Sequence, residues 1–191
     1  MKRLIILLFI MYAPFAAKSI MAQDFALKTD LVKWGTASFN IEPELKVGKK
    51  STVALALSWN PFTFNDNKKW RHLWIQPEYR YWFCAPFGGH FIGVHPIYSH
   101  FNAGNVQFTF GLFDELKDYR FQGDLFGAGI GYGYHWILNN RWSIEAEIGF
   151  GAAYVDYDKY ECATCGDKVG SDHKVKLMPT KAAVSLIYII K

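Results

Sequence analysis

Charged side chains recur at a spacing of two residues in several stretches of this chain. In an extended strand, residues two apart share one face, so each such pair points to the same side of a sheet. The seven charged residues that define these faces are Glu42, Glu44, Glu78, Arg80, Glu145, Glu147 and Lys181. On an enclosed face they must pair with one another, because an isolated buried charge is costly. We predict an internal ion-pair network that fills the fold, with a gate or a proton path as the alternative.

Histidines on the same faces raise the question of catalysis. His72, His95 and His135, together with Ser99, could supply a base and a nucleophile for a lipid-modifying reaction. Such catalysis needs the nucleophile and the base within hydrogen-bond distance, and a third group that orients the base. The alternation places these residues at different heights along the strands, and no local motif joins them. We therefore predict hydrogen-bonding histidines, no catalytic residues and no cofactor.

A Cys-x-x-Cys motif, Cys162 and Cys165, lies in the last long polar stretch. Zinc favours four ligands, and the chain has no second cysteine pair, although Asp172 and His173 follow closely. A redox motif would need a helix N-terminus, and no helical pattern occurs in this stretch. We expect a disulfide formed in an oxidising compartment and no metal. The third cysteine, Cys84, is expected to contribute to packing.

Apolar and polar residues alternate with period two through most of the chain, and helical spacing is nearly absent. The alternation predicts eight strands, near residues 26–33, 39–47, 52–59, 70–83, 90–101, 126–136, 141–154 and 181–190. The fifth departs from a regular central strand because Pro96 has no backbone donor. Short links alternate with longer polar ones, as in outer-membrane barrels that have short periplasmic turns and longer outer loops.

The polar face separates a membrane barrel from a soluble one, which would bury its apolar face. Glycines alternate from Gly127 to Gly133 on this face. They would weaken a solvated strand, but they leave room inside a narrow barrel. Aromatic residues form two bands typical of membrane girdles, namely Trp34, Trp59, Phe62, Phe64, Trp70 and Tyr154 near the long loops and Tyr81, Phe83, Tyr134, Trp136, Trp142 and Tyr188 near the short turns. We predict an all-β fold, an eight-stranded antiparallel up-and-down transmembrane β-barrel.

Residues 1–22 have the pattern of a secretory signal peptide. Lys2 and Arg3 precede an apolar run, and the small residue Ala22 suits cleavage. Cleavage would leave residues 23–191 as one barrel domain with 18 basic and 17 acidic residues. This balance argues against nucleic-acid binding.

Four segments carry a resemblance to a known family. They are Trp-Asn-Pro-Phe-Thr-Phe at 59–64, Gln-Pro-Glu-Tyr-Arg-Tyr-Trp-Phe-Cys at 76–84, Asp-Tyr-Asp-Lys-Tyr at 156–160, and 179–188, which begins Pro-Thr-Lys. In these segments the chain resembles the Bacteroidetes family catalogued as domain of unknown function 3575. The resemblance covers nearly the whole chain after the signal. It implies an outer-membrane barrel, often encoded beside fimbrial or surface-adhesin components, and it supplies no catalytic residues.

The expected function follows from these features. We predict a non-enzymatic, monomeric outer-membrane protein, structural or adhesion-related, that contacts membrane lipids. Its outer loops are expected to bind a partner such as a fimbrial subunit or another surface protein. The alternatives are a lipid-modifying outer-membrane barrel enzyme and a soluble lipocalin-like carrier of small molecules.

Overall fold

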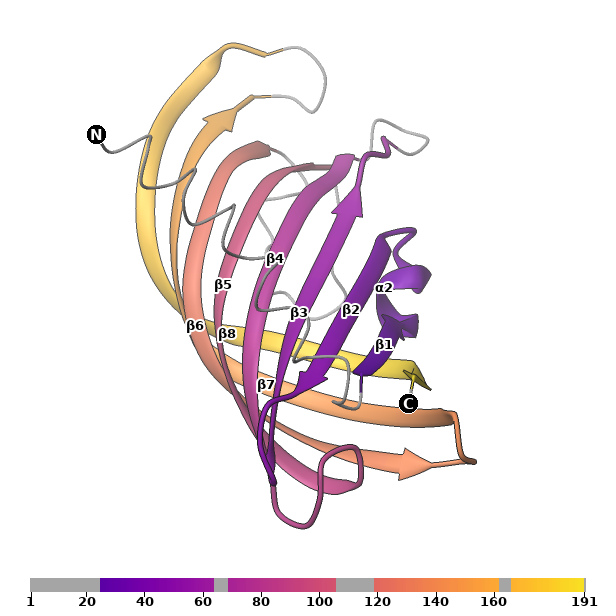
Figure 1. Ribbon diagram of the computed structural model, residues 1–191. Helices are drawn as coiled ribbons and strands as arrows, with labels where there is room; N and C mark the ends of the chain where they lie inside the picture. The colour runs from indigo at the N-terminus through magenta and orange to yellow at the C-terminus, as the bar shows by residue number, and fades with distance from the viewer. Residues whose placement is uncertain (1–24, 64–68, 106–118, 162–165, 191) are drawn as a thin grey trace, which may run out of the picture.

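A computed structural model describes residues 25–63, 69–105, 119–161 and 166–190 (Figure 1). Eight antiparallel strands, each paired with the next in sequence, form one sheet, and pairing of the last strand with the first closes it into a ring. The strands are β1 (Phe25–Asp30), β2 (Phe39–Lys46), β3 (Ser51–Asn60), β4 (Lys69–Trp82), β5 (Gly89–Gly104), β6 (Arg120–Ile137), β7 (Trp142–Tyr160) and β8 (Lys168–Ile190). The prediction of an all-β fold with eight antiparallel strands is confirmed. The predicted signal peptide, residues 1–22, lies outside the described residues.

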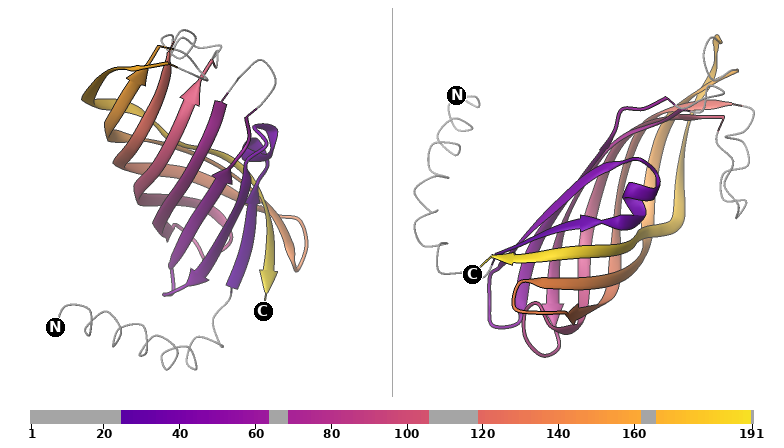
Figure 2. Two further views of the ribbon diagram at one scale, coloured as in Figure 1. Left: turned by 90° about the horizontal axis from the view of Figure 1, so that it is seen from above. Right: turned by 90° about the vertical axis from the view of Figure 1, so that its right-hand side faces the viewer.

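Strand length grows along the chain, from six residues in β1 to 23 in β8. The first strand ends three residues before the predicted Lys33, because the Asp30 carboxylate accepts a hydrogen bond from the Val32 amide at 2.9 Å. This bond caps the short helix α2 (Leu31–Gly35). β8 therefore rises well beyond the end of β1 (Figures 1 and 2). Residues 168–177 of β8, all exposed, are called the β8 extension below.

Pro96 lies inside β5 without ending the strand. The register between β4 and β5 places Pro77 opposite Pro96, and both prolines face outward. Because the two prolines lie opposite each other, their missing donors fall in a single gap of the hydrogen-bond ladder. The same gap places Glu78 opposite His95 on the inner face.

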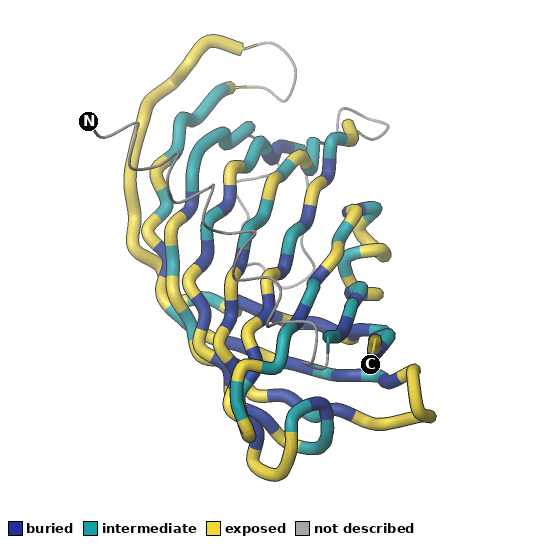
Figure 3. Tube along the Cα trace, viewed as in Figure 1, coloured by how far each residue is buried: buried dark blue, intermediate teal, exposed yellow. Residues whose placement is uncertain are grey.

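Burial alternates along the ring strands (Figure 3), and many large apolar side chains of these strands are on the exposed, outer face. Ile130 is 64% exposed and Ile148 is 53% exposed, whereas Glu145 is 2% exposed and Arg80 is fully buried. The polar face is therefore the inner face. Among the described residues, no helix is long and apolar enough to cross a bilayer.

Apolar side chains close the interior near both ends of the ring. Trp82, Phe87 and Phe91 are buried next to the short turns, with the Trp82 and Phe91 ring centroids 4.7 Å apart. A second cluster includes Ile97 and Leu125. The buried charged residues lie in the same interior as these two clusters. Charged and apolar side chains together occupy the space inside the ring.

Candidate functional site

The structure brings the seven charged residues predicted from the sequence together inside the ring, and all seven are buried. Arg80 is at their centre. Its guanidinium lies within hydrogen-bond distance of five carboxylates, those of Glu42 (2.9 Å), Glu44 (3.0 Å), Glu78 (3.2 Å), Glu145 (3.0 Å) and Glu147 (2.7 Å). The period-two alternation predicted these residues correctly, because residues two apart in a strand share the face that the structure places inside the ring.

Two lysines flank Arg80. The Lys28 ammonium lies 3.0 Å from Glu145 and also pairs with Glu44. On the other side, Lys181 lies 3.0 Å from Glu147 and also pairs with Glu78. Lys28 was not predicted as a site residue. The available signal was its position on the face opposite to Leu27 and Thr29 in the first strand.

Negative charge is in excess in this group. Among the described residues, the network joins five carboxylates to three cations, which leaves two formal negative charges uncompensated. Buried charges without partners are expensive, and such a site usually takes up protons or a cation. The ion pairs of this interior therefore do not balance its charge.

A β-bulge delivers two adjacent residues of β8 to the interior. Gly149 pairs with Lys181, but the next residue, Phe150, pairs with Pro179, so Thr180 is the extra residue. Both Thr180 and Lys181 are consequently buried. Strict alternation would have sent Thr180 outward, so the sequence analysis could not place it.

Two of the four segments that carry the family resemblance meet at this bulge. Gln76, Glu78 and Arg80 all point inward from β4. The Gln76 side-chain amide donates to the Thr180 carbonyl oxygen at 3.4 Å, and Lys181 pairs with Glu78. The Gln-Pro-Glu-Tyr-Arg-Tyr and Pro-Thr-Lys segments therefore build one site.

Each of the three candidate histidines has a partner other than the candidate nucleophile Ser99. His95 Nε2 lies 2.9 Å from Thr180 Oγ1, His135 Nδ1 lies 3.2 Å from Glu145, and His72 Nε2 lies 3.5 Å from the Ser58 hydroxyl. Ser99 is buried. Within the described part of the chain, no hydrogen bond joins Ser99 to a histidine.

Of the three cysteines, the structure describes only Cys84, which falls outside this interior. Cys162 and Cys165, the predicted disulfide, lie outside the described residues. Cys84 is free and exposed, so the expectation that it contributes to packing is wrong. It lies in the turn between β4 and β5, where it can meet solvent.

The β8 extension is a second distinctive surface. Its exposed residues include Val169, Val175 and the 89% exposed Leu177. Lys168 donates to Asp158 of β7 at 2.8 Å, and this bond holds the pKa of the Asp158 carboxyl below its ordinary value. β1 pairs with β8 only from Ser185 onward, so the opposite edge of the extension has no strand partner among the described residues.

Fold and site together define a class: an all-β protein whose closed sheet of eight antiparallel strands encloses a buried ion-pair network. Within that class, the chain belongs to the family described as "Protein of unknown function (DUF3575)", whose model matches residues 5–190. The family resemblance inferred from the sequence is confirmed. Comparison with curated proteins and with solved structures finds no match for the chain.

Proposed function

We propose that this protein is a non-enzymatic outer-membrane β-barrel that displays a docking edge for another surface protein. One observation carries the membrane assignment: the ring is polar inside and apolar outside. Val94, Ile130 and Phe150 are each at least half exposed on its outer wall, while buried carboxylates fill its interior. An apolar outer wall needs lipid, and a closed sheet satisfies the backbone hydrogen bonds that lipid cannot.

Aromatic side chains support the same assignment at both ends of the outer wall. Tyr81, Phe83, Trp136 and Trp142 are exposed near the short turns. Trp34, Trp59, Phe62 and Tyr154 are exposed toward the other end. Two such bands are expected where a barrel meets the headgroup layers.

The filled interior shifts the expected function to the ends of the barrel. Arg80 and its five carboxylates occupy the middle, and Trp82 and Phe91 pack below them. An eight-stranded barrel is only wide enough for side chains to fill it. A structural or adhesion-related anchor therefore fits the geometry better than a pore.

The β8 extension supplies the docking edge of this proposal. The edge that has no strand partner among the described residues is a template to which an extended segment can add as a further strand. We assign that segment to a surface protein such as a fimbrial subunit, since the extension lies at the end opposite the short turns. The protein itself is proposed to be a monomer that binds membrane lipids and no nucleic acid.

The alternatives have less support. A soluble lipocalin-like carrier would place its apolar residues inside the ring, where Glu44, Glu78 and Arg80 are buried. A lipid-modifying enzyme would need Ser99 next to a base, and the interior histidines bond to other groups.

Fractionation of cells tests the membrane proposal. We expect the protein in the outer membrane, extractable only with detergent, and running faster on a gel before boiling than after it. A monomer recovered in aqueous buffer without detergent would contradict the proposal.

Site-specific crosslinking on intact cells tests the docking edge. A photo-reactive residue would replace Val169 or Ser171, two residues apart on the extension, with Ile148 on the ring wall as the matched control. Strand addition predicts one linked surface protein, whose attachment point moves by two residues between the two positions. Attachment points without this register, or links only from position 148, would exclude the docking edge.

A further inference from the structure

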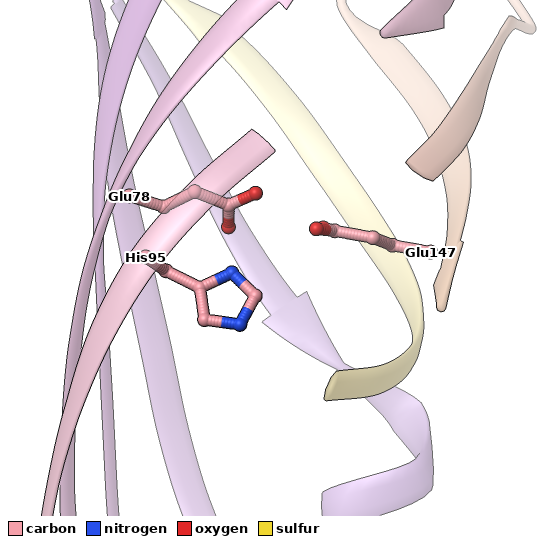
Figure 4. A group of neighbouring side chains, drawn as sticks. All are labelled: Glu78, His95 and Glu147. Atoms are coloured by element: carbon pink, nitrogen blue, oxygen red, sulfur yellow. The ribbon is translucent and has the colours of Figure 1, made fainter. Parts of the chain in front are cut away.

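Three buried side chains from different strands converge inside the ring (Figure 4). Two of them pair with Arg80. Glu78 comes from β4, His95 from β5 and Glu147 from β7. Each can offer a ligand atom, and these atoms all lie within 4.8 Å of one another. The exposed fractions of the three residues are 2%, 2% and 5%.

Each of these side chains has one polar atom that is bonded and one that is not. Glu78 and Glu147 use Oε2 to pair with Arg80 and Lys181. Their Oε1 atoms and His95 Nδ1 are buried without a hydrogen-bond partner. Buried polar atoms in native proteins nearly always have a partner, so three in one place call for a ligand.

His95 is oriented by its neighbour. Its Nε2 lies 2.9 Å from Thr180 Oγ1, the residue that the bulge turns inward. This hydrogen bond at Nε2 fixes the orientation of the imidazole and leaves Nδ1 available to a metal, as in many histidine ligand sites. The bulge therefore positions both Lys181 and the Thr180 hydroxyl that orients His95.

Glycines on the wall leave the space that these side chains occupy. A Cβ atom added at Gly131 would lie 2.5 Å from Glu147 Oε1, and one at Gly129 would lie 2.7 Å from His95 Nε2. A Cβ atom at Gly93 would overlap Glu78 Oε1. Residues larger than glycine would displace the groups that converge here.

From these observations we infer a divalent cation site formed by Glu78, His95 and Glu147. Two carboxylates and one imidazole are ligands that zinc accepts, with water in a fourth position. A divalent ion would neutralise the two excess negative charges of the network and give the unpartnered atoms a partner. It would also brace three strands from within, which revises the sequence-based expectation that the protein has no metal.

Metal analysis of the purified full-length protein in detergent tests this inference. The background variant carries Cys84→Ser, Cys162→Ser and Cys165→Ser and a tag without histidine, so that neither a cysteine nor the tag binds zinc. After EDTA treatment and reloading with ZnCl₂, we expect about one zinc ion per chain, the stoichiometry of a single site. We also expect the reloaded protein to unfold at a higher temperature than the EDTA-treated protein.

Two histidine variants provide the matched comparison. His95→Gln should lower zinc affinity by at least roughly tenfold, because it removes a ligand, while His72→Gln should retain it, because His72 lies outside the group. Equal loss in both variants, or retention in His95→Gln, would overturn the site.

Cobalt provides a readout that does not depend on the folding of the two histidine variants. Co²⁺ bound to the background protein should show visible absorption of a nitrogen–oxygen site that ZnCl₂ abolishes. If neither zinc nor cobalt binds stoichiometrically, the inference is wrong, and protons shared between Glu78 and Glu147 would balance the charge instead. The membrane proposal would stand in that case, since fractionation does not depend on metal.

Discussion

The lower part of β8 and the β8 extension belong to one continuous strand, yet their surroundings differ. From Thr180 to Ile190, nearly every second residue is buried inside the ring, and β1 and β7 pair with the two edges of β8 from Ser185 onward. From residue 168 to 177 every residue is exposed, and β7 is the only strand that pairs with it in the part of the chain that the structure describes. In Figure 3 the boundary is visible as the change from alternating colours to a continuous exposed stretch.

If the extension binds a partner as proposed, this difference separates the part of β8 that stabilises the ring from the part that takes part in recognition. In the ring, each side chain points either into the interior or to the outer wall, so a substituted side chain contacts either buried charges or the proposed lipid. In the extension, both faces are exposed, so substitutions there should lower the free energy of unfolding only slightly. The following predictions test this contrast, from the largest expected effect to the smallest.

Replacement of Arg80 by alanine should have the largest effect. It would leave five buried carboxylates facing two lysines, and removal of one partner from a buried pair costs about 3–5 kcal/mol. We expect the Arg80→Ala protein to lose its heat-modifiable form in the membrane fraction. Arg71→Ala is the matched control, because Arg71 lies on the same strand and is exposed. If both variants fold equally well, the network around Arg80 does not contribute substantially to the stability of the ring.

Arginine on the outer wall should have the next largest effect. Ile148→Arg places a charge near mid-strand on the proposed lipid face and should lower the free energy of unfolding by roughly 2–4 kcal/mol. Val169→Arg, on the β8 extension, should change it by no more than about 0.5 kcal/mol. Denaturant titration of vesicle-reconstituted protein measures both changes. A tolerated Ile148→Arg together with a damaging Gly149→Arg would mean that the inner and outer faces are reversed.

Removal of the Cys162–Cys165 pair should have the smallest effect on the barrel. Two intervening residues close a very small ring, so a disulfide there would stabilise at the low end of the usual range. The double Cys→Ser variant should insert normally and keep its gel migration. On intact cells, a membrane-impermeant thiol reagent should modify these two cysteines only after reduction. Labelling without reductant would show free thiols, and failure of the variant to insert would show that the loop supports the ring.

The sequence predicted the number of strands and their faces because period two is a local signal. It predicted the last three strands too short, since β6 begins at residue 120 and not 126, β7 continues to 160 and not 154, and β8 begins at 168 and not 181. Glu145 and Glu147 are two residues apart, so their common face needs no knowledge of the fold. The first strand was predicted too long because the Asp30 cap competes with strand extension, and the short apolar segment that follows reads equally well as either structure.

The arrangement of the site was less accessible, because it depends on register between distant strands. The bulge at Thr180 breaks the period for one residue and leaves no local mark in the sequence. Similarly, the convergence of Glu78, His95 and Glu147 requires β4, β5 and β7 at one height, which alternation within each strand does not specify. The seven residues named from the sequence already carry an excess of negative charge, and only the structure shows that Lys28 reduces this excess to two.

Spin-label accessibility in reconstituted vesicles tests the central claim most directly. Single labels at positions 148 and 169 would be introduced into a cysteine-free background, with Cys84, Cys162 and Cys165 replaced by serine. If the apolar wall lies in lipid, the label at 148 will be relaxed more by oxygen, which dissolves in the bilayer, than by a water-soluble nickel chelate. The label at 169 will show the opposite preference. Greater relaxation by the nickel chelate at 148 would contradict the account, because it would place the apolar wall of the ring in water.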